Sequence, residues 1–164
     1  MNPPPLHLRL ATLEDRPALQ DLYTQHLQFL ASFNPSVQAD APLQDLWFER
    51  PGVLFPWLLK TQTTLLGFAL LGGRKLSEAM GSDTDFYLHE FHMAEPFRGQ
   101  GFGRKAVHEL LKEHPGSWSV DVHPANPGAL RFWEVALASV ELKQTDYFTE
   151  EGVRFIRHMT RSPR

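Results

Sequence analysis

The spacing of apolar residues divides the first half of the chain into strands and helices. Leucines at alternate positions of 6–10 predict a strand, and apolar residues at helical spacing predict a helix over 13–31. A second, short helix is predicted over 43–50. Two apolar runs, 53–60 and 64–71, are separated by a few polar residues, which predicts two strands joined by a hairpin.

The second half of the chain alternates strands with helices. It begins with a polar segment rich in small residues, 72–85, which is predicted to be an exposed loop. The elements predicted after it are a strand at 86–93, a helix at 101–113, a strand at 118–122, a helix at 127–137 and strands at 140–144 and 153–159. We therefore expect an α/β or α+β fold, with a central twisted sheet of about seven strands flanked by about four helices.

Composition narrows the classes of protein. The 164 residues are 42% hydrophobic and 21% charged, which is typical of one globular domain. A net charge of -3 and a pI near 6.2 argue against a nucleic-acid partner. The absence of cysteine excludes disulfides, thiolate zinc sites and a cysteine nucleophile. No apolar run approaches the roughly 18 residues that span a bilayer, and residues 1–5 lack a signal-peptide layout, so we expect a cytoplasmic protein without a membrane partner.

Three alternate glycines, Gly99, Gly101 and Gly103, lie between a predicted strand and a predicted helix. Without side chains in the way, several main-chain N–H groups can converge on one anion, and the following helix adds its positive dipole end. Arg98 and Arg104 bring positive charge next to this turn. The spacing matches neither a Walker A loop, which needs a Gly-Lys pair, nor the GxGxxG dinucleotide motif. We expect a diphosphate site here; a helix that only begins at a glycine turn is the alternative.

The turn and a second segment resemble a known family. The segment Arg98-Gly99-Gln100-Gly101-Phe102-Gly103 is similar to the Q/R-x-x-G-x-G/A pattern of the GNAT superfamily of acyl-CoA-dependent N-acetyltransferases. Downstream, Asn126-Pro127-Gly128-Ala129-Leu130-Arg131-Phe132-Trp133 resembles the N-x-x-A-x-x-F-Y segment of the same family. The resemblance implies one GNAT-like acetyltransferase domain over 1–164, with its core at about 7–159.

The resemblance also implies a site for acetyl-CoA. In the family, the amides of the turn hold the pyrophosphate of coenzyme A, and the preceding strand holds the pantetheine and acetyl groups through main-chain hydrogen bonds. An asparagine and an aromatic residue of the second segment line the far wall. The cofactor-binding residues implied for this chain are Phe91, His92, Met93, Arg98, Gly99, Gln100, Gly101, Phe102, Gly103, Arg104, Asn126 and Trp133.

The sequence departs from the family pattern at the end of the second segment. Trp133 stands where relatives carry the tyrosine that often protonates the leaving thiolate, and an indole N–H cannot act as that acid. The Gly-Phe pair that usually follows is replaced by Leu137-Ala138. The chain is therefore identified as an atypical branch. The acid is open between Tyr147, in a predicted loop at 146–152 between the last two strands, Tyr87 and solvent.

Transfer to an amine requires a base, because an alkyl ammonium with a pKa near ~10.4 has no free lone pair. Strand periodicity predicts the faces of 86–93 as Tyr87, His89, Phe91 and Met93 on one side and Leu88, Glu90 and His92 on the other. His89 is the first candidate base, since imidazole titrates in the useful range and some relatives carry histidine here, and Glu90 is the second. A histidine without a catalytic role is the alternative for His89. On opposite faces, His89 and His92 cannot share a metal, and no metal site is expected.

The resemblance thus implies an N-acetyltransferase that moves an acetyl group from acetyl-CoA to a primary amine by direct attack in a ternary complex. The expected acceptor is an amine of a small molecule or of a peptide or protein. A catalytically decayed acyl-CoA-binding module, acting as a sensor or interaction domain, is the alternative that Trp133 leaves open. Because dimers are frequent in the superfamily, a homodimer is one expected state.

Overall fold

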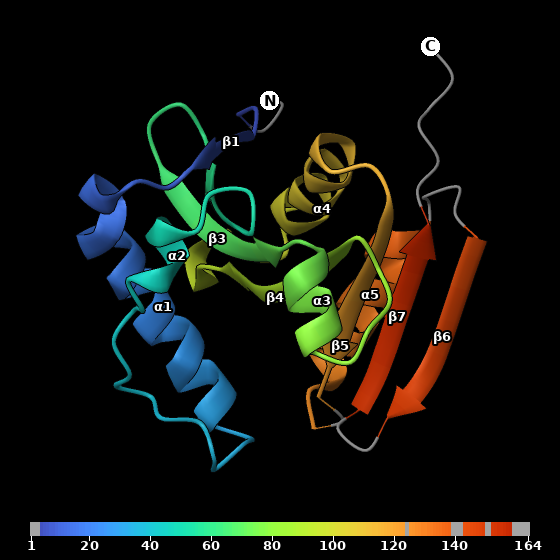
Figure 1. Ribbon diagram of the computed structural model, residues 1–164. Helices are drawn as coiled ribbons and strands as arrows, with labels where there is room; N and C mark the ends of the chain where they lie inside the picture. Colours follow the sequence, from blue (N-terminus) through green and yellow to red (C-terminus); the bar gives the residue numbers. More distant parts are fainter. Residues whose placement is uncertain (1–3, 124, 139–142, 150–151, 159–164) are drawn as a thin grey trace.

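The computed structural model describes residues 4–123, 125–138, 143–149 and 152–158, the last two segments by their backbone alone. Its centre is a mixed sheet with the strand order β1-β2-β3-β4-β5-β7-β6 (Figure 1). Neighbouring strands are antiparallel except β4 and β5, which are parallel. The strands are β1 (His7–Leu10), β2 (Leu54–Lys60), β3 (Leu65–Gly72), β4 (Phe86–Met93), β5 (Ser117–Val122), β6 (Lys143–Thr149) and β7 (Gly152–His158).

Helices cover both faces of the sheet. On one face, α1 (Arg16–Ala31) and α2 (Leu46–Glu49) bury Leu19, Leu22 and Trp47 against Phe68 and Leu70 of β3. On the other face, α4 (Phe102–Glu113) and α5 (Pro127–Ala138) pack against β3, β4 and β5. The mixed α+β class expected from the sequence is confirmed.

The described residues contain five α-helices where about four were expected. The additional helix, α3 (Arg74–Ala79), lies in the segment predicted to be a loop. Its Leu76 side chain fills the space above Gly72, where an added Cβ would lie 2.1 Å from it, and its buried Ser77 hydroxyl bonds to Thr84. These tertiary contacts stabilise a helix of six residues that its polar composition does not indicate.

β4 contains a bulge at His89. Leu71 of β3 is opposite Leu88, and the preceding residue, Leu70, is opposite Glu90, so His89 has no partner on β3. The extra residue reverses the alternation of side chains along the rest of the strand. Leu88 and Phe91 were predicted to lie on opposite faces, yet both pack in the core beneath α4 and α5. The predicted division of β4 into two faces is therefore wrong after Leu88.

β4 and β5 diverge beyond the bulge. They pair only where Phe86, Tyr87 and Leu88 meet Trp118, Ser119 and Val120. The remainder of β4, from Glu90 to Met93, is paired with β3 and has no strand partner on the side of β5 among the described residues. Its main-chain groups on that side are left for other partners.

Tyr147 lies in β6 and not in the predicted loop. In the antiparallel pair of β6 and β7 it is opposite Arg154, and Thr149 is opposite Gly152. The described part of β6 extends to Thr149, five residues beyond the end at 144 that its apolar pattern predicts. The side chain of Tyr147 lies outside the described part of the structure.

Candidate active site

The glycine turn follows the end of β4 and leads into α4. Gly99 and Gly101 have φ angles of +74° and +86°, in the left-handed region that favours glycine. Gly101 is the N-cap of α4, so the first N–H groups of this twelve-residue helix have no partner within the helix. Gly103 lies within the first turn, where an added Cβ would come 3.0 Å from the ring of Phe132 on α5.

A cavity of about 500 Å³ extends from this turn along the second half of β4. It is lined by ten of the twelve residues expected to bind the cofactor: Phe91, His92, Met93, Arg98, Gly99, Gly101, Gly103, Arg104, Asn126 and Trp133. The side chains of the other two point elsewhere. Gln100 donates to the Pro96 carbonyl, and Phe102 is buried beside Leu59 and Met93.

Two arginines border the cavity in different ways. The Arg98 Nε donates to the Met93 carbonyl at 2.7 Å, and its guanidinium lies 5.3 Å from the centre of the Phe29 ring. Arg98 therefore ties the turn to the end of β4. Arg104 is exposed and forms no ion pair with the part of the chain that the structure describes, so its charge faces the cavity without a protein counter-ion there.

A second cavity, of about 260 Å³, lies between the diverging ends of β4 and β5. Glu90, His89 and Asp121 line it, and the ring of Phe33 closes one side together with His123, 5.6 Å away. It shares six lining residues with the first cavity: His26, Leu30, Phe91, Asn126, Ala129 and Trp133. The two cavities therefore meet beside the second half of β4.

Both candidate bases lie at this second cavity, in different surroundings. The Glu90 side chain is 16% exposed, and its Oε2 lies 2.5 Å from Nε2 of His26. Its Oε1 is 3.8 Å from Nε2 of His89, which is 38% exposed. Since an ionised carboxylate carries no proton, His26 is the donor of the short bond. Glu90 is therefore held in place, whereas His89 is partly in solvent.

His26 is the site residue that sequence reasoning missed. It lies on the buried face of α1, in register with Leu19, Leu22 and Leu30. A histidine within an otherwise apolar helical stripe was the signal that could have identified it. The pattern does not give its partner, because Glu90 is 64 residues away in the chain.

His92 lies next to His26 and is buried. The two rings are 5.3 Å apart, and Nε2 of His92 has no hydrogen-bond partner among the described residues. Burial, together with the charges of His26 and Arg98, lowers the pKa of His92 to about 3. Its imidazole is therefore neutral at physiological pH and contributes no charge to the cavity.

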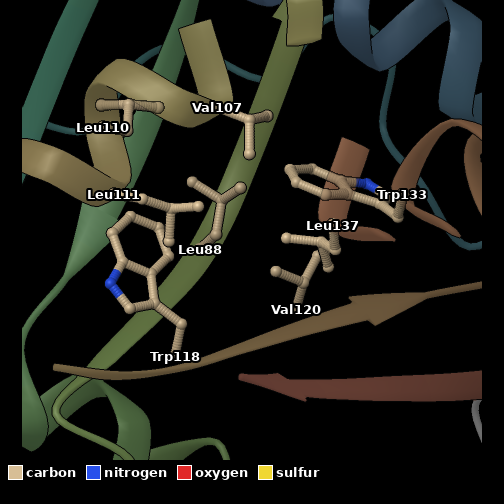
Figure 2. Close-up of a pocket in the computed structure, with 8 residues that line it drawn as sticks. All are labelled: Leu88, Val107, Leu110, Leu111, Trp118, Val120, Trp133 and Leu137. Atoms are coloured by element: carbon tan, nitrogen blue, oxygen red, sulfur yellow. The ribbon is translucent and has the colours of Figure 1, made fainter. Parts of the chain in front are cut away.

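Trp133 separates the cavities from the core. Its ring meets that of Phe91 edge-on at 5.4 Å and lines both cavities. On its inner side lies a hollow of about 10 Å³. Figure 2 shows the eight apolar side chains around this hollow, from β4, β5, α4 and α5: Leu88, Val107, Leu110, Leu111, Trp118, Val120, Trp133 and Leu137.

Of the tyrosines whose side chains are described, Tyr23 and Tyr87, neither lines one of the two cavities. The Tyr87 hydroxyl donates to Asp121 at 2.6 Å, so it is already engaged at the edge of the second cavity. The described residues contain no cluster of three His, Asp or Glu side chains that could hold a metal. None of the described helices is long and apolar enough to cross a membrane.

Comparison with known proteins gives the family. The model of the acetyltransferase (GNAT) family matches residues 10–137. No curated protein sequence matches the chain. Among solved structures, an acetyltransferase from Thermus thermophilus superposes with a TM-score of 0.68 at 17% identity, covering 93% of this chain and 94% of that one.

Two other solved structures share the fold. The aminoglycoside acetyltransferase AAC(6')-Ib, in complex with coenzyme A and kanamycin, gives a TM-score of 0.64 at 19% identity over 94% of this chain and 95% of that one. The ribosomal-protein-S18-alanine N-acetyltransferase from Escherichia coli gives 0.54 at 15% identity over 94% and 96%. With the family model covering most of the chain, this protein belongs to the GNAT acetyltransferase family.

Proposed function

We propose that this chain transfers the acetyl group of acetyl-CoA to a primary amine by direct attack in a ternary complex. The observation that carries the proposal is the meeting of two cavities beside the second half of β4. One is large and begins at a glycine turn, and the other is smaller and contains Glu90. The proposal treats residues 7–159 as one acetyltransferase domain.

The first cavity fits coenzyme A. The left-handed glycines and the free N–H groups at the start of α4 suit a pyrophosphate, and Arg104 adds an uncompensated positive charge. Phe91 and Phe132, whose rings are stacked 5.7 Å apart, give an apolar wall for the pantetheine. The free main-chain edge of β4 offers N–H and C=O groups for the pantetheine amides and the thioester.

Glu90 is the better placed of the two candidate bases. With Oε2 bonded to His26, Oε1 is the atom that takes the proton from the acceptor ammonium. The nitrogen lone pair then attacks the thioester carbonyl carbon, and the carbon–sulfur bond breaks. The departing thiolate takes its proton from solvent or from Tyr147, because Trp133 cannot supply one. His89 is the second candidate base.

The acceptor is proposed to be a cationic amine of a small molecule or of a peptide. The described lining of the second cavity contains the carboxylates of Glu90 and Asp121 and neither lysine nor arginine. Both kinds of acceptor are represented among proteins of similar fold, one of them bound to kanamycin and another named for a ribosomal-protein alanine.

Calorimetry and turnover test the proposal together. We expect acetyl-CoA to bind, and coenzyme A to be released in the presence of amines drawn from a broad panel. Glu90→Gln is expected to keep acetyl-CoA binding and to lose about 10²-fold or more in kcat, the usual contribution of a general base. His89→Ala is expected to lose only a few-fold, and Glu109→Gln, on the exposed face of α4, serves as the control.

Three outcomes contradict parts of the proposal. No heat on titration with acetyl-CoA would exclude the cofactor. Binding without release of coenzyme A for any amine would indicate a binding module. A larger loss for His89→Ala than for Glu90→Gln would transfer the role of base to His89.

A further inference from the structure

The buried histidine of α1 has no role in the reaction described above. We infer that His26 is a positioning residue, which fixes one oxygen of Glu90 so that the other is presented to the acceptor amine. The inference rests on the proposed function, because it assigns a role to His26 only if Glu90 is the base. It rests on the geometry of α1 and β4 and on the place of His26 between the two cavities.

The His26 ring is held from two sides. The ring of Phe68 on β3 lies 5.7 Å away at an interplanar angle of 89°, and the ring of His92 lies 5.3 Å away at 61°. Rotation of the imidazole would break both contacts, so the direction of its Nε2–H bond is fixed. That bond points at Oε2 of Glu90, 2.5 Å away.

Glu90 depends on this one donor. Within the described part of the chain, the His26 ring is the only group within hydrogen-bond distance of its carboxylate, since His89 is 3.8 Å away. Tyr23, one turn earlier on α1, also faces Glu90, and burial and the charge of Glu90 raise the pKa of Tyr23, which keeps its proton. Outside the histidine pair, Arg98 is the charged group that acts on His92 and lowers its pKa.

His26 also lies where the reaction would occur. It lines both cavities, whereas Glu90 lines only the smaller one. Without His26, a carboxylate that is 16% exposed would be free to rotate toward solvent or toward His89. A displacement of about 1 Å between reacting groups can cost about 10²-fold in rate, so the loss would appear in kcat.

A pair of substitutions of equal length separates this role from packing. His26→Gln keeps an amide N–H near the position of Nε2, and His26→Met fills similar space without a donor. We expect kcat of His26→Gln within about fivefold of wild type and kcat of His26→Met lower by about 10- to 100-fold. The KM for acetyl-CoA is expected to stay within about threefold in both, because the turn and α4 are untouched.

His114→Met is the matched control for loss of a buried histidine. His114 is 9% exposed, compared with 6% for His26, and accepts a hydrogen bond from Trp57 away from both cavities. The control is expected to melt at a lower temperature and to keep its kcat. Melting curves of all variants establish that activity is compared on folded protein.

A cycle with Glu90→Gln completes the test. If His26 acts through Glu90, His26→Met in the Glu90→Gln background should change the residual kcat by less than about twofold. Equal kcat for His26→Gln and His26→Met, or the same loss in both backgrounds, would overturn the inference. A wild-type kcat for Glu90→Gln alone would instead reject Glu90 as the base, so the two failures are distinguishable. If His26→Met does not fold, a loss of more than tenfold in His26→Gln would still overturn the inference.

Discussion

The two halves of β4 differ in their neighbours on the side of β5. The first half, Phe86 to Leu88, pairs with β5, and Leu88 is buried in the core beneath α4 and α5. The second half, Glu90 to Met93, has no described partner on that side; its last three residues line the larger cavity, and Glu90 lines the smaller one. His89, the bulged residue, separates them.

This difference shows how a single strand serves both the core and the site. In the first half, main-chain groups are used by the sheet on both sides, and the side chains fill space. In the second half, main-chain groups on one side are available to a ligand, and Glu90 and His92 face α1 because the bulge reverses the alternation. One inserted residue therefore sets which side chains reach the cavities.

Insertion of one alanine between His89 and Glu90 is expected to have the largest effect. With one more residue ahead of Glu90, residues 90–93 would turn over, and Glu90 and His92 would face the apolar core while Phe91 and Met93 faced α1. A carboxylate buried without a partner costs several kcal/mol, so we expect little folded protein and no binding of acetyl-CoA by calorimetry. An insertion variant that melts like the wild type would contradict this account of the two faces of β4.

His89→Ala is the control for that insertion. It removes the imidazole and keeps the number of backbone atoms, so the bulge and the faces of β4 should persist. We expect the free energy of unfolding to change by no more than about 0.5 kcal/mol, as for other partly exposed side chains.

The sequence predicts the regular strands and helices well, but it does not predict the bulge at His89 in β4. The strand predicted at 86–93 and the helix predicted at 101–113 agree with β4 and α4 to within one residue, because their apolar periods are long and uninterrupted. A bulge depends on the pairing of two strands, and that pairing is a tertiary property. The periodicity of β4 alone therefore assigned Phe91 to the wrong face.

The candidate site shows the same limit. The glycine turn is visible because its chemistry lies in consecutive residues, and ten of the twelve residues expected to bind the cofactor line one cavity. The short bond between His26 and Glu90 joins α1 to β4, and no local pattern connects them. The order in which the two candidate bases were ranked from sequence, His89 before Glu90, likewise could not take this contact into account.

Leu88→Ala tests the first half of β4. Leu88 is buried and lines the small hollow beside Val120 and Trp133, so truncation would enlarge a space that already exists (Figure 2). We expect a loss of about 2–5 kcal/mol in the free energy of unfolding, measured by denaturant titration. The KM for acetyl-CoA should stay near wild type below the melting temperature, and a large rise in KM would mean that the two halves are not separable.

Phe91→Leu tests the second half of β4. Phe91 stacks on Phe132 and meets Trp133 edge-on, and it lines both cavities. Leucine keeps most of the apolar volume, so the free energy of unfolding should fall by less than about 1.5 kcal/mol. We expect the KM for acetyl-CoA to rise about tenfold through loss of the aromatic wall. A change in stability without a change in KM would contradict the assignment of the second half of β4 to the cofactor site.

His92 is expected to make the stability of the second half of β4 depend on pH, with no effect at neutral pH. The pKa of His92 is about 3 in the folded chain and near ~6.5 when unfolded, so between these values only the unfolded state binds the proton. The contribution of His92 to the free energy of unfolding is therefore fully present above pH ~6.5, and it is lost as the pH is lowered toward 3. His92→Phe keeps a ring of similar size and removes this proton, so its melting temperature should fall less steeply than that of the wild type between pH 6.5 and 4. Burial also lowers the pKa of His114, which adds the same slope to both proteins and cancels in the comparison. Parallel curves would show that His92 takes up its proton in the folded state as readily as in the unfolded chain.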